Sequence, residues 1–297
     1  MRRLLRINPS FFHLFPRAFA NLGANDPVRM AAATAFFAFF ALPPITIILS
    51  QVLSTLFADR RQSVSGRLFR QLTDLFGPQS ARQLQDISQR LQPSGTDIWP
   101  TIGSIVLLLL TATTLFAVIK NSLNQLWNVK AKEKRTVVQV LRDRTVALAI
   151  IIGSGLLFTA SVTINRALPA EGPGAILGRH ATSVLILTTW FAGLFKYLPD
   201  VRIRWSAVGI GALLTGVLFL AGELILTQLL TYQQLKSVHG TAGSLTLVLL
   251  FVFYGALIMY YGAAFTRQYA QWADLETTPT PDAVTYVIQD VPEADPD

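Results

Sequence analysis

Six long apolar runs constrain this chain more than any other feature. They contain no charged residue and cover residues 30–58, 98–119, 145–165, 181–195, 205–222 and 240–266. About 18 or more mostly apolar residues in a helix cross the roughly 30 Å hydrocarbon core of a bilayer. Backbone amides must be paired in lipid, so the helix is the default for such runs. The sequence therefore predicts an all-α, polytopic integral membrane protein with six transmembrane helices.

Composition favours one membrane domain. Of 297 residues, 52% are hydrophobic and 14% are charged, which is too apolar for an ordinary soluble domain. We expect a cytoplasmic N-terminal interfacial segment, a six-helix membrane domain that includes an outer amphipathic loop, and a disordered acidic C-terminal tail. These parts cover residues 1–27, 28–270 (with the loop at 58–97) and 271–297. None is long enough for a separate soluble catalytic domain.

The residue types argue against several functions. There is no cysteine, and the three histidines, His13, His180 and His239, are scattered. We therefore expect no metal site and no cofactor. The sequence shows no phosphate loop, nucleophile elbow or dinucleotide fingerprint, so we expect no enzymatic activity. The net charge of +8 comes from Lys and Arg beside the apolar runs, where they set topology, and no nucleic-acid partner is expected.

The distribution of basic residues predicts the orientation. With the N-terminus inside, 16 of the 25 Lys and Arg fall in cytoplasmic segments and 9 in outer segments. Cytoplasmic loops carry the excess of positive charge in membrane proteins. The sequence therefore predicts a multi-pass membrane protein with both termini cytoplasmic.

Two adjacent prolines, Pro43 and Pro44, lie near the centre of the first run. Proline lacks the amide hydrogen and clashes with the preceding helical turn. A helix broken at mid-membrane is a device that transporters use for substrate or ion sites. The alternative is a kink that serves packing alone, since proline is common in membrane helices.

Polar residues interrupt the other runs at a few positions. Asn121 and Asn124 follow the second run, where they either line a cytoplasmic mouth or hydrogen-bond to the adjoining loop. Glu223 is the only acidic residue in a hydrophobic region, and an ionisable group in a membrane is a functional candidate by default. However, it lies about 27 Å along its helix, so it either serves function or simply reaches water. We expect seven residues to line a substrate path: Pro43, Pro44, Asn121, Asn124, Glu223, His239 and Tyr254.

Several short motifs occur in a familiar order. They are the Ala-rich start of the first run with Pro43-Pro44, Leu123-Asn124-x-x-Trp127, Tyr197-x-Pro199 with Val201, Gly211-Ala212-Leu213, Gly240-x-Ala242-Gly243-Ser244 and Gly262-Ala263-x-Phe265-Thr266. With these motifs the chain resembles, over about residues 25–270, the YihY family of bacterial inner-membrane proteins, also called the virulence factor BrkB family. The resemblance implies six transmembrane helices and little about chemistry.

The chain departs from that family at two positions. Relatives often carry Tyr where this chain has His239, and Glu where it has Ala264. If that Glu serves ion coupling in relatives, this chain must achieve ion coupling without it. Family members have also carried the label ribonuclease BN. The residues here do not support it, because a metal-dependent ribonuclease needs clustered His and Asp.

The leading hypothesis is a transporter or exporter of an unidentified, lipid-like or amphipathic substrate. Its rival is a non-catalytic membrane scaffold that organises the cell envelope. The expected partners are membrane lipids and a small-molecule or lipid substrate. Small residues spaced four apart, Ala207 with Gly211 and Ala212 with Gly216, also permit a homo-oligomer.

Overall fold

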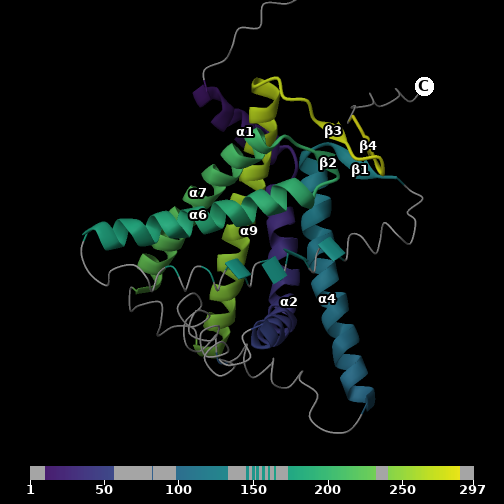
Figure 1. The fold of residues 1–297 in the computed structure, drawn as a ribbon, viewed down its shortest axis with the longest axis vertical. Helices are drawn as coiled ribbons and strands as arrows, with labels where there is room; N and C mark the ends of the chain where they lie inside the picture. The colour runs from purple at the N-terminus through teal and green to yellow at the C-terminus, as the bar shows by residue number, and fades with distance from the viewer. Residues whose placement is uncertain are drawn as a thin grey trace, which may run out of the picture.

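The computed structural model describes residues 11–56, 82, 98–132, 173–231 and 240–287, together with ten residues of the segment 145–164. The elements in chain order are η1 (Phe11–His13), α1 (Leu14–Gly23), α2 (Pro27–Leu56), α4 (Ile98–Leu126), β1 (Val129–Ala131), α6 (Pro173–Tyr197), β2 (Val201–Arg202), α7 (Trp205–Thr231), α9 (Gly240–Trp272), β3 (Thr278–Pro279) and β4 (Ala283–Thr285). Figure 1 shows long helices with the four short strands, β1 to β4, gathered toward the top of the picture. We call this part of the molecule the strand-bearing end.

Helix α9 lies at the centre of the described bundle. It contacts α1, α2, α4 and α7, while α6 packs against the outer side of α7 (Figure 1). A fully buried tyrosine, Tyr260, ties three of these helices together. Its hydroxyl lies 2.6 Å from that of Thr34 on α2 and is also hydrogen-bonded by Ser122 on α4. Buried polar groups need such partners, so the contact fixes how α2, α4 and α9 meet.

A repeated motif forms the crossing of α7 and α9. Gly211 and Thr215 on α7 face Thr266 and Gly262 on α9, and each threonine hydroxyl occupies the space that a Cβ on the opposite glycine would need. Each hydroxyl donates to the carbonyl of the glycine four residues earlier on its own helix, at 2.6 Å for Thr215 and 2.7 Å for Thr266. Glycine thus lets the two backbones approach closely.

The segment after α9 differs from the expectation of a disordered tail. Strand β4 pairs antiparallel with β1, with Val129 opposite Thr285, and β3 pairs with β2. The amide of Thr280 also donates to the carbonyl of Asp200 at 2.9 Å. Composition predicted disorder here, but backbone hydrogen bonds to two segments distant in sequence hold the described part of the tail, through Val287, in place.

The described part of the N-terminal segment, for which the sequence predicts an interfacial position, contains the helix α1. Leu14, Ala18 and Leu22 of α1 are buried against the bundle, where α1 contacts α9. Phe12 and Phe19 remain exposed. This arrangement is typical of a helix that lies at a membrane surface, with aromatic side chains available to lipid.

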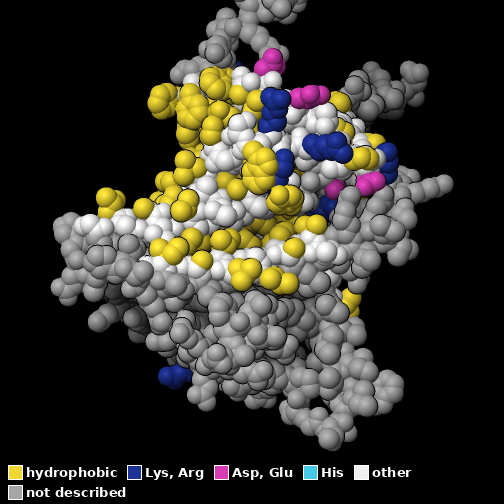
Figure 2. All heavy atoms as spheres, in the orientation of Figure 1, with side chains coloured by type: hydrophobic (Ala, Val, Ile, Leu, Met, Phe, Trp, Pro, Cys, Tyr) yellow, Lys and Arg dark blue, Asp and Glu magenta, His cyan; other side chains and the backbone are white. Residues whose placement is uncertain are grey.

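Among the described residues, two helices are long and apolar enough to cross a membrane, at Trp205–Ile225 and Val248–Trp272, and Pro27–Ala41 is a shorter apolar helix. Figure 2 shows hydrophobic side chains across the face that α6 and α7 form, with Lys and Arg gathered at the strand-bearing end. The structure thus supports a helical membrane protein. The count of six spans and the cytoplasmic location of the termini stay predictions.

Helix α2 continues through Pro43 and Pro44, so its secondary structure is not broken there. Figure 1 shows its first part running down the picture and its last part nearly end-on, so the helix bends along its length. A bend is what two prolines in a helix interior impose. The side chains of both prolines lie outside the described residues, as do the two amphipathic stretches expected within 58–97.

Candidate functional site

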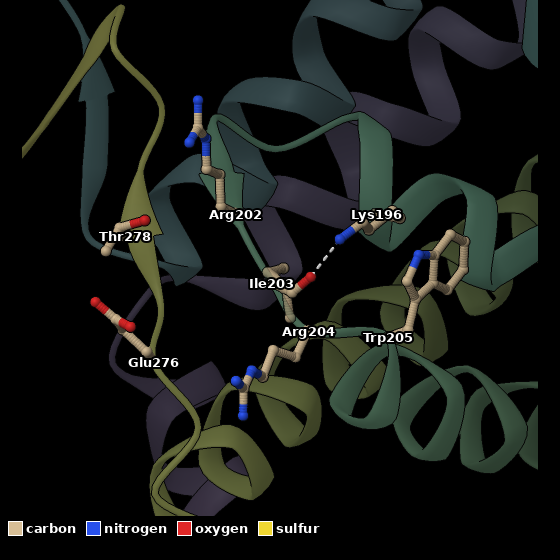
Figure 3. A pocket seen from close by; sticks show the side chains of 7 residues that line it. All are labelled: Lys196, Arg202, Ile203, Arg204, Trp205, Glu276 and Thr278. Atoms are coloured by element: carbon tan, nitrogen blue, oxygen red, sulfur yellow. Dashed lines mark hydrogen bonds between the residues drawn. The ribbon is translucent and has the colours of Figure 1, made fainter.

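The turn between α6 and α7 carries an alternating pattern of burial. Val201 and Ile203 point inward, whereas Arg202 and Arg204 are exposed, as expected when successive extended residues face opposite sides. Lys196, near the end of α6, donates to the carbonyl of Ile203 at 2.5 Å. Figure 3 shows both arginines extending away from Ile203 in different directions.

The residues of this turn line a basic cavity of about 380 Å³. Trp205 lines one side, where its ring centre is 5.3 Å from the Lys196 ammonium, and Glu276 and Thr278 from the tail line the other (Figure 3). The ring of Trp205 also packs edge-on against that of Tyr197, with 6.2 Å between centres. In the sequence analysis, Lys196, Arg202 and Arg204 served only to predict topology, because the tail was not expected to contact them.

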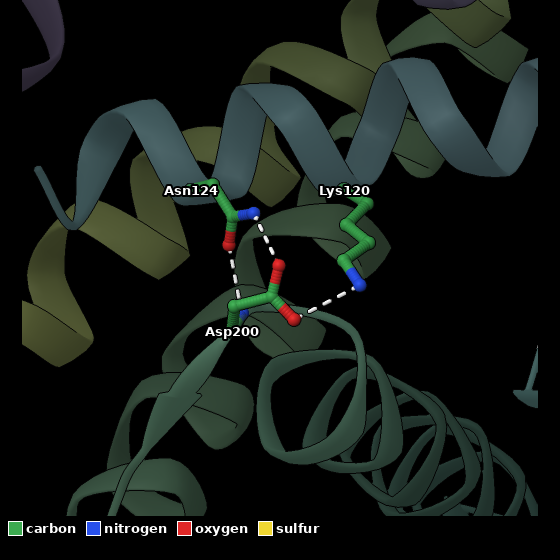
Figure 4. Close-up of polar contacts among 3 residues, drawn as sticks. All are labelled: Lys120, Asn124 and Asp200. Atoms are coloured by element: carbon green, nitrogen blue, oxygen red, sulfur yellow. Dashed lines mark hydrogen bonds and ion pairs between the residues drawn. The ribbon is translucent and has the colours of Figure 1, made fainter. Parts of the chain in front are cut away.

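A polar cluster joins the end of α4 to the same turn (Figure 4). Lys120 and Asn124 lie one helical turn apart, so they share a face of α4. The Lys120 ammonium is 2.9 Å from one carboxylate oxygen of Asp200, and the Asn124 amide donates to the other oxygen at 2.9 Å. The backbone amide of Asp200 donates back to the Asn124 side-chain oxygen at 2.7 Å. Each polar atom of this three-residue cluster thus has a partner.

The cluster is important because its two charged side chains are buried. The side chains of Lys120 and Asp200 are 11% and 7% exposed, and removing a charge from water costs several kcal/mol unless a partner compensates. In the sequence analysis, Asn124 is a candidate for the substrate path or for a contact with the adjoining loop, and Asp200 is not named. The available signal was an acidic residue next to the Tyr197-x-Pro199 motif in a chain with few charges.

Asn121, three residues before Asn124 on α4, is exposed. It lines a polar cavity of about 400 Å³ together with Asn124, Gln125, Lys130 and Tyr286. Both alternatives for the two asparagines therefore have a structural counterpart. Asn124 hydrogen-bonds to the adjoining turn, and both residues border a polar opening at the strand-bearing end.

Arg267 of α9 supports the same end of α4. One guanidinium nitrogen donates to the carbonyl of Leu126, in the last turn of α4. The last carbonyls of a helix lack helical partners and carry partial negative charge, so a cation there is stabilising. Arg267 thus fixes the end of α4 that carries Lys120 and Asn124.

Glu223 and Tyr254 lie elsewhere in the bundle. Glu223 is partly exposed on α7, within electrostatic range of His180 on α6. The Tyr254 hydroxyl donates to the carbonyl of Leu218 at 3.2 Å, and its ring occupies the space beside Gly222. Tyr254 thus packs α9 against α7, next to Glu223. At 1.5 Å per residue, Glu223 is roughly 27 Å along α7 from Trp205, so the structure does not bring these two residues to the asparagine pair. His239 lies outside the described residues.

An apolar cavity of about 390 Å³ lies between α6 and the segment 146–157. Val146, Ile150 and Leu157 line one wall, and Trp190 and Leu194 of α6 line the other. Gly153 and Gly193 also line it, and among the described residues no atom outside the glycine's own stretch of helix lies within 4 Å of where a Cβ on either would stand.

The fold and the site define a helical membrane protein with polar and basic cavities at one end. The family model described as "Virulence factor BrkB" matches residues 18–285. The chain therefore belongs to the virulence factor BrkB family, as the resemblance of its motifs implied.

Similar curated proteins are UPF0761 membrane proteins. One from Chromohalobacter salexigens is 23% identical over 84% of this chain and 62% of its own length. One from Azotobacter vinelandii is 25% identical over 84% and 60%, and one from Chlorobium phaeobacteroides is 27% identical over 84% and 58%. The chain thus spans about three fifths of the length of these relatives. No solved structure matches it.

Proposed function

We propose that this protein is a transporter or exporter of an amphipathic, lipid-like substrate in the bacterial inner membrane, without catalytic chemistry. The observation that carries the proposal is the apolar cavity between α6 and the segment 146–157. Ligand cavities typically have volumes of roughly 300–1,000 Å³ and mostly apolar walls, and this cavity of about 390 Å³ falls in that range.

The two glycines strengthen this proposal. Close packing of helices normally places small residues against a neighbouring backbone, as Gly211 and Gly262 do in this chain. Gly153 and Gly193 instead have open space beside them. A residue without a side chain that faces empty space keeps that space available to an apolar ligand such as an acyl chain.

The test uses the full chain reconstituted in liposomes that carry a fluorescent phospholipid. A reductant added outside bleaches only the outer leaflet, so the slow phase of bleaching reports movement between leaflets. We expect the protein to accelerate this phase. Gly193→Phe places a ring in the cavity without a backbone clash and should return the rate toward that of protein-free vesicles.

Leu185→Phe is the matched control, because Leu185 is 65% exposed on the same helix and does not line the cavity. This variant should keep the wild-type rate. If the wild-type protein gives no acceleration, the transport proposal is wrong for phospholipids and the non-catalytic scaffold becomes the better hypothesis. If Gly193→Phe keeps full activity in correctly folded protein, the cavity is not the path.

A further inference from the structure

The basic cavity at the α6–α7 turn has an excess of positive charge. Lys196, Arg202 and Arg204 line it, against the single carboxylate of Glu276. Among the described residues, neither arginine forms an ion pair, and both are exposed. The Lys196 ammonium is already engaged by the Ile203 carbonyl and the Trp205 ring. The two guanidinium groups are therefore the cations available to an anionic ligand.

Guanidinium groups are well suited to bind anions that present several oxygen atoms. Their planar set of N–H donors binds carboxylate or phosphate oxygens in pairs, with stronger hydrogen bonds than neutral donors give. The cavity also lies beside the first residue of α7, Trp205. The N-terminus of a helix carries partial positive charge and favours phosphate binding. The positive charge of the cavity and its place at the start of α7 together favour a phosphate group.

The position of the cavity favours a phosphate that belongs to a lipid. Lys and Arg side chains at the strand-bearing end lie next to the hydrophobic surface over α6 (Figure 2). Tyr197 and Trp205 are 61% and 56% exposed, and exposed Tyr and Trp typically mark the level of lipid headgroups. Basic pockets between transmembrane helices on the cytoplasmic side are suited to anionic headgroups.

The same two rings separate the basic cavity from the apolar cavity. Tyr197 lines the apolar cavity, Trp205 lines the basic cavity, and the rings are in contact. Lys196 and Tyr197, consecutive at the end of α6, thus border one cavity each. The two cavities are therefore neighbours on either side of one ring contact, which matches the charged head and apolar chain of an amphipathic molecule.

We propose that the basic cavity binds the phosphate of an anionic phospholipid through Arg202 and Arg204, while an acyl chain of the same lipid lies in the apolar cavity. This inference deepens the proposed function, because it names the class of substrate. It rests on that function only for the movement of the lipid and not for its binding.

The test is a binding titration of the delipidated full chain in neutral detergent, followed by native mass spectrometry. Phosphatidylglycerol and phosphatidylcholine with identical acyl chains are compared, and inorganic phosphate is the competitor. We expect a preference for phosphatidylglycerol that the Arg202→Gln/Arg204→Gln variant lowers by about tenfold or more, because charge-assisted hydrogen bonds to phosphate are lost. Arg29→Gln, an exposed cation at the same end of the bundle, should keep the preference.

Equal binding of the two lipids overturns the inference, and so does an equal loss of preference in Arg29→Gln. Complete displacement of phosphatidylglycerol by millimolar inorganic phosphate would assign the site to free phosphate and overturn the lipid assignment. Gly193→Phe separates the two halves of the proposal, since it should weaken the binding of long-chain lipid more than that of a short-chain analogue. A retained preference without movement in liposomes supports this inference and refutes the transport function.

Discussion

Asp200 is the residue on which the strand-bearing end of the bundle most depends. Its carboxylate compensates the buried charge of Lys120 and accepts a hydrogen bond from Asn124. Asp200→Ala removes the ion pair from that buried ammonium, and removal of one member of a buried pair typically costs about 3–5 kcal/mol. We expect a large fall in the thermal unfolding midpoint in detergent, measured by circular dichroism.

The exposed pair of Asp26 and Arg29 provides the control for that measurement. These groups are 3.3 Å apart, but their side chains are 72% and 70% exposed. Exposed pairs contribute about 0–1 kcal/mol, so Arg29→Ala should leave the midpoint nearly unchanged. Equal midpoints for wild type and Asp200→Ala would show that the cluster does not stabilise the fold.

From the sequence alone, Asn124 could be identified as a member of this cluster, but Asp200 could not. Asn124 was identifiable because an amide just past an apolar run is unusual. Its partner lies 76 positions away, in a turn whose proline offers a sufficient local reason for the chain to stop being helical. Pairing across such a separation depends on how α4 meets the end of α6, and hydrophobic periodicity within one helix carries no information about that.

At the scale of elements, the crossing of α7 and α9 depends on two close glycine contacts. A Cβ at Gly211 would stand 1.8 Å from the Thr266 hydroxyl oxygen, whereas at Gly209, two residues earlier, nothing lies within 4 Å. Gly211→Ala should destabilise the protein by about 1–3 kcal/mol through overpacking. Gly209→Ala should be neutral or stabilising by up to about 1 kcal/mol, because alanine favours the helix.

Melting of these variants in detergent checks the prediction, and Thr266→Ala in the Gly211→Ala background provides a second measurement. This change removes the opposing hydroxyl, so it should recover part of the lost stability. Such non-additivity is expected for residues in contact. If Gly209→Ala and Gly211→Ala have the same effect, the two helices do not cross at this point.

The strand pair of the tail makes a second prediction at this scale. Ala131 lies opposite Ala283 in the β1–β4 register. Backbone bonds join Lys132 to Asp282 on one side of this pair, so it is a non-hydrogen-bonded pair with about 4.5 Å between Cα atoms, within the range of a disulfide. Cysteines at both positions should cross-link under mild oxidation, seen as a mobility shift that a reductant reverses.

The out-of-register pair Ala131→Cys/Val284→Cys is the control, because neighbouring residues of a strand point to opposite faces. It should cross-link far less. Equal cross-linking of both pairs would indicate a mobile tail, which is what composition predicted. The tail shows why that prediction failed, since acidic residues and prolines describe a segment's own tendency and not the strand edges available to it.

The elements themselves were more readily predicted than their contacts. The apolar runs anticipated α2, α4, α6, α7 and α9, with bounds that differ mainly at the ends. Helix α6 begins at Pro173, before the uncharged run, because proline is well suited to the first helical position and because Arg179 does not interrupt a helix. The open cavity beside Gly193 was not predictable, since a glycine in a membrane helix equally indicates close packing.

At the scale of the whole molecule, both described ends of the chain lie at the strand-bearing end (Figure 1). Helix α9 has 33 residues and spans about 50 Å, more than the roughly 30 Å hydrocarbon core. Its first residue, Gly240, therefore lies across the membrane from β4 if α9 is a span. The excess of Lys and Arg predicts that the strand-bearing end is cytoplasmic.

Because the chain lacks cysteine, single-cysteine variants test this arrangement directly. A membrane-impermeant maleimide added to spheroplasts should label Gly240→Cys at once, and Val284→Cys on β4 only after permeabilisation. The unmodified chain, which has no thiol, should remain unlabelled in both conditions. The reverse pattern would invert the orientation and place the basic cavity at the outer surface. Immediate labelling of both variants would show that α9 does not separate the two sides, and the transport proposal would lose its structural basis.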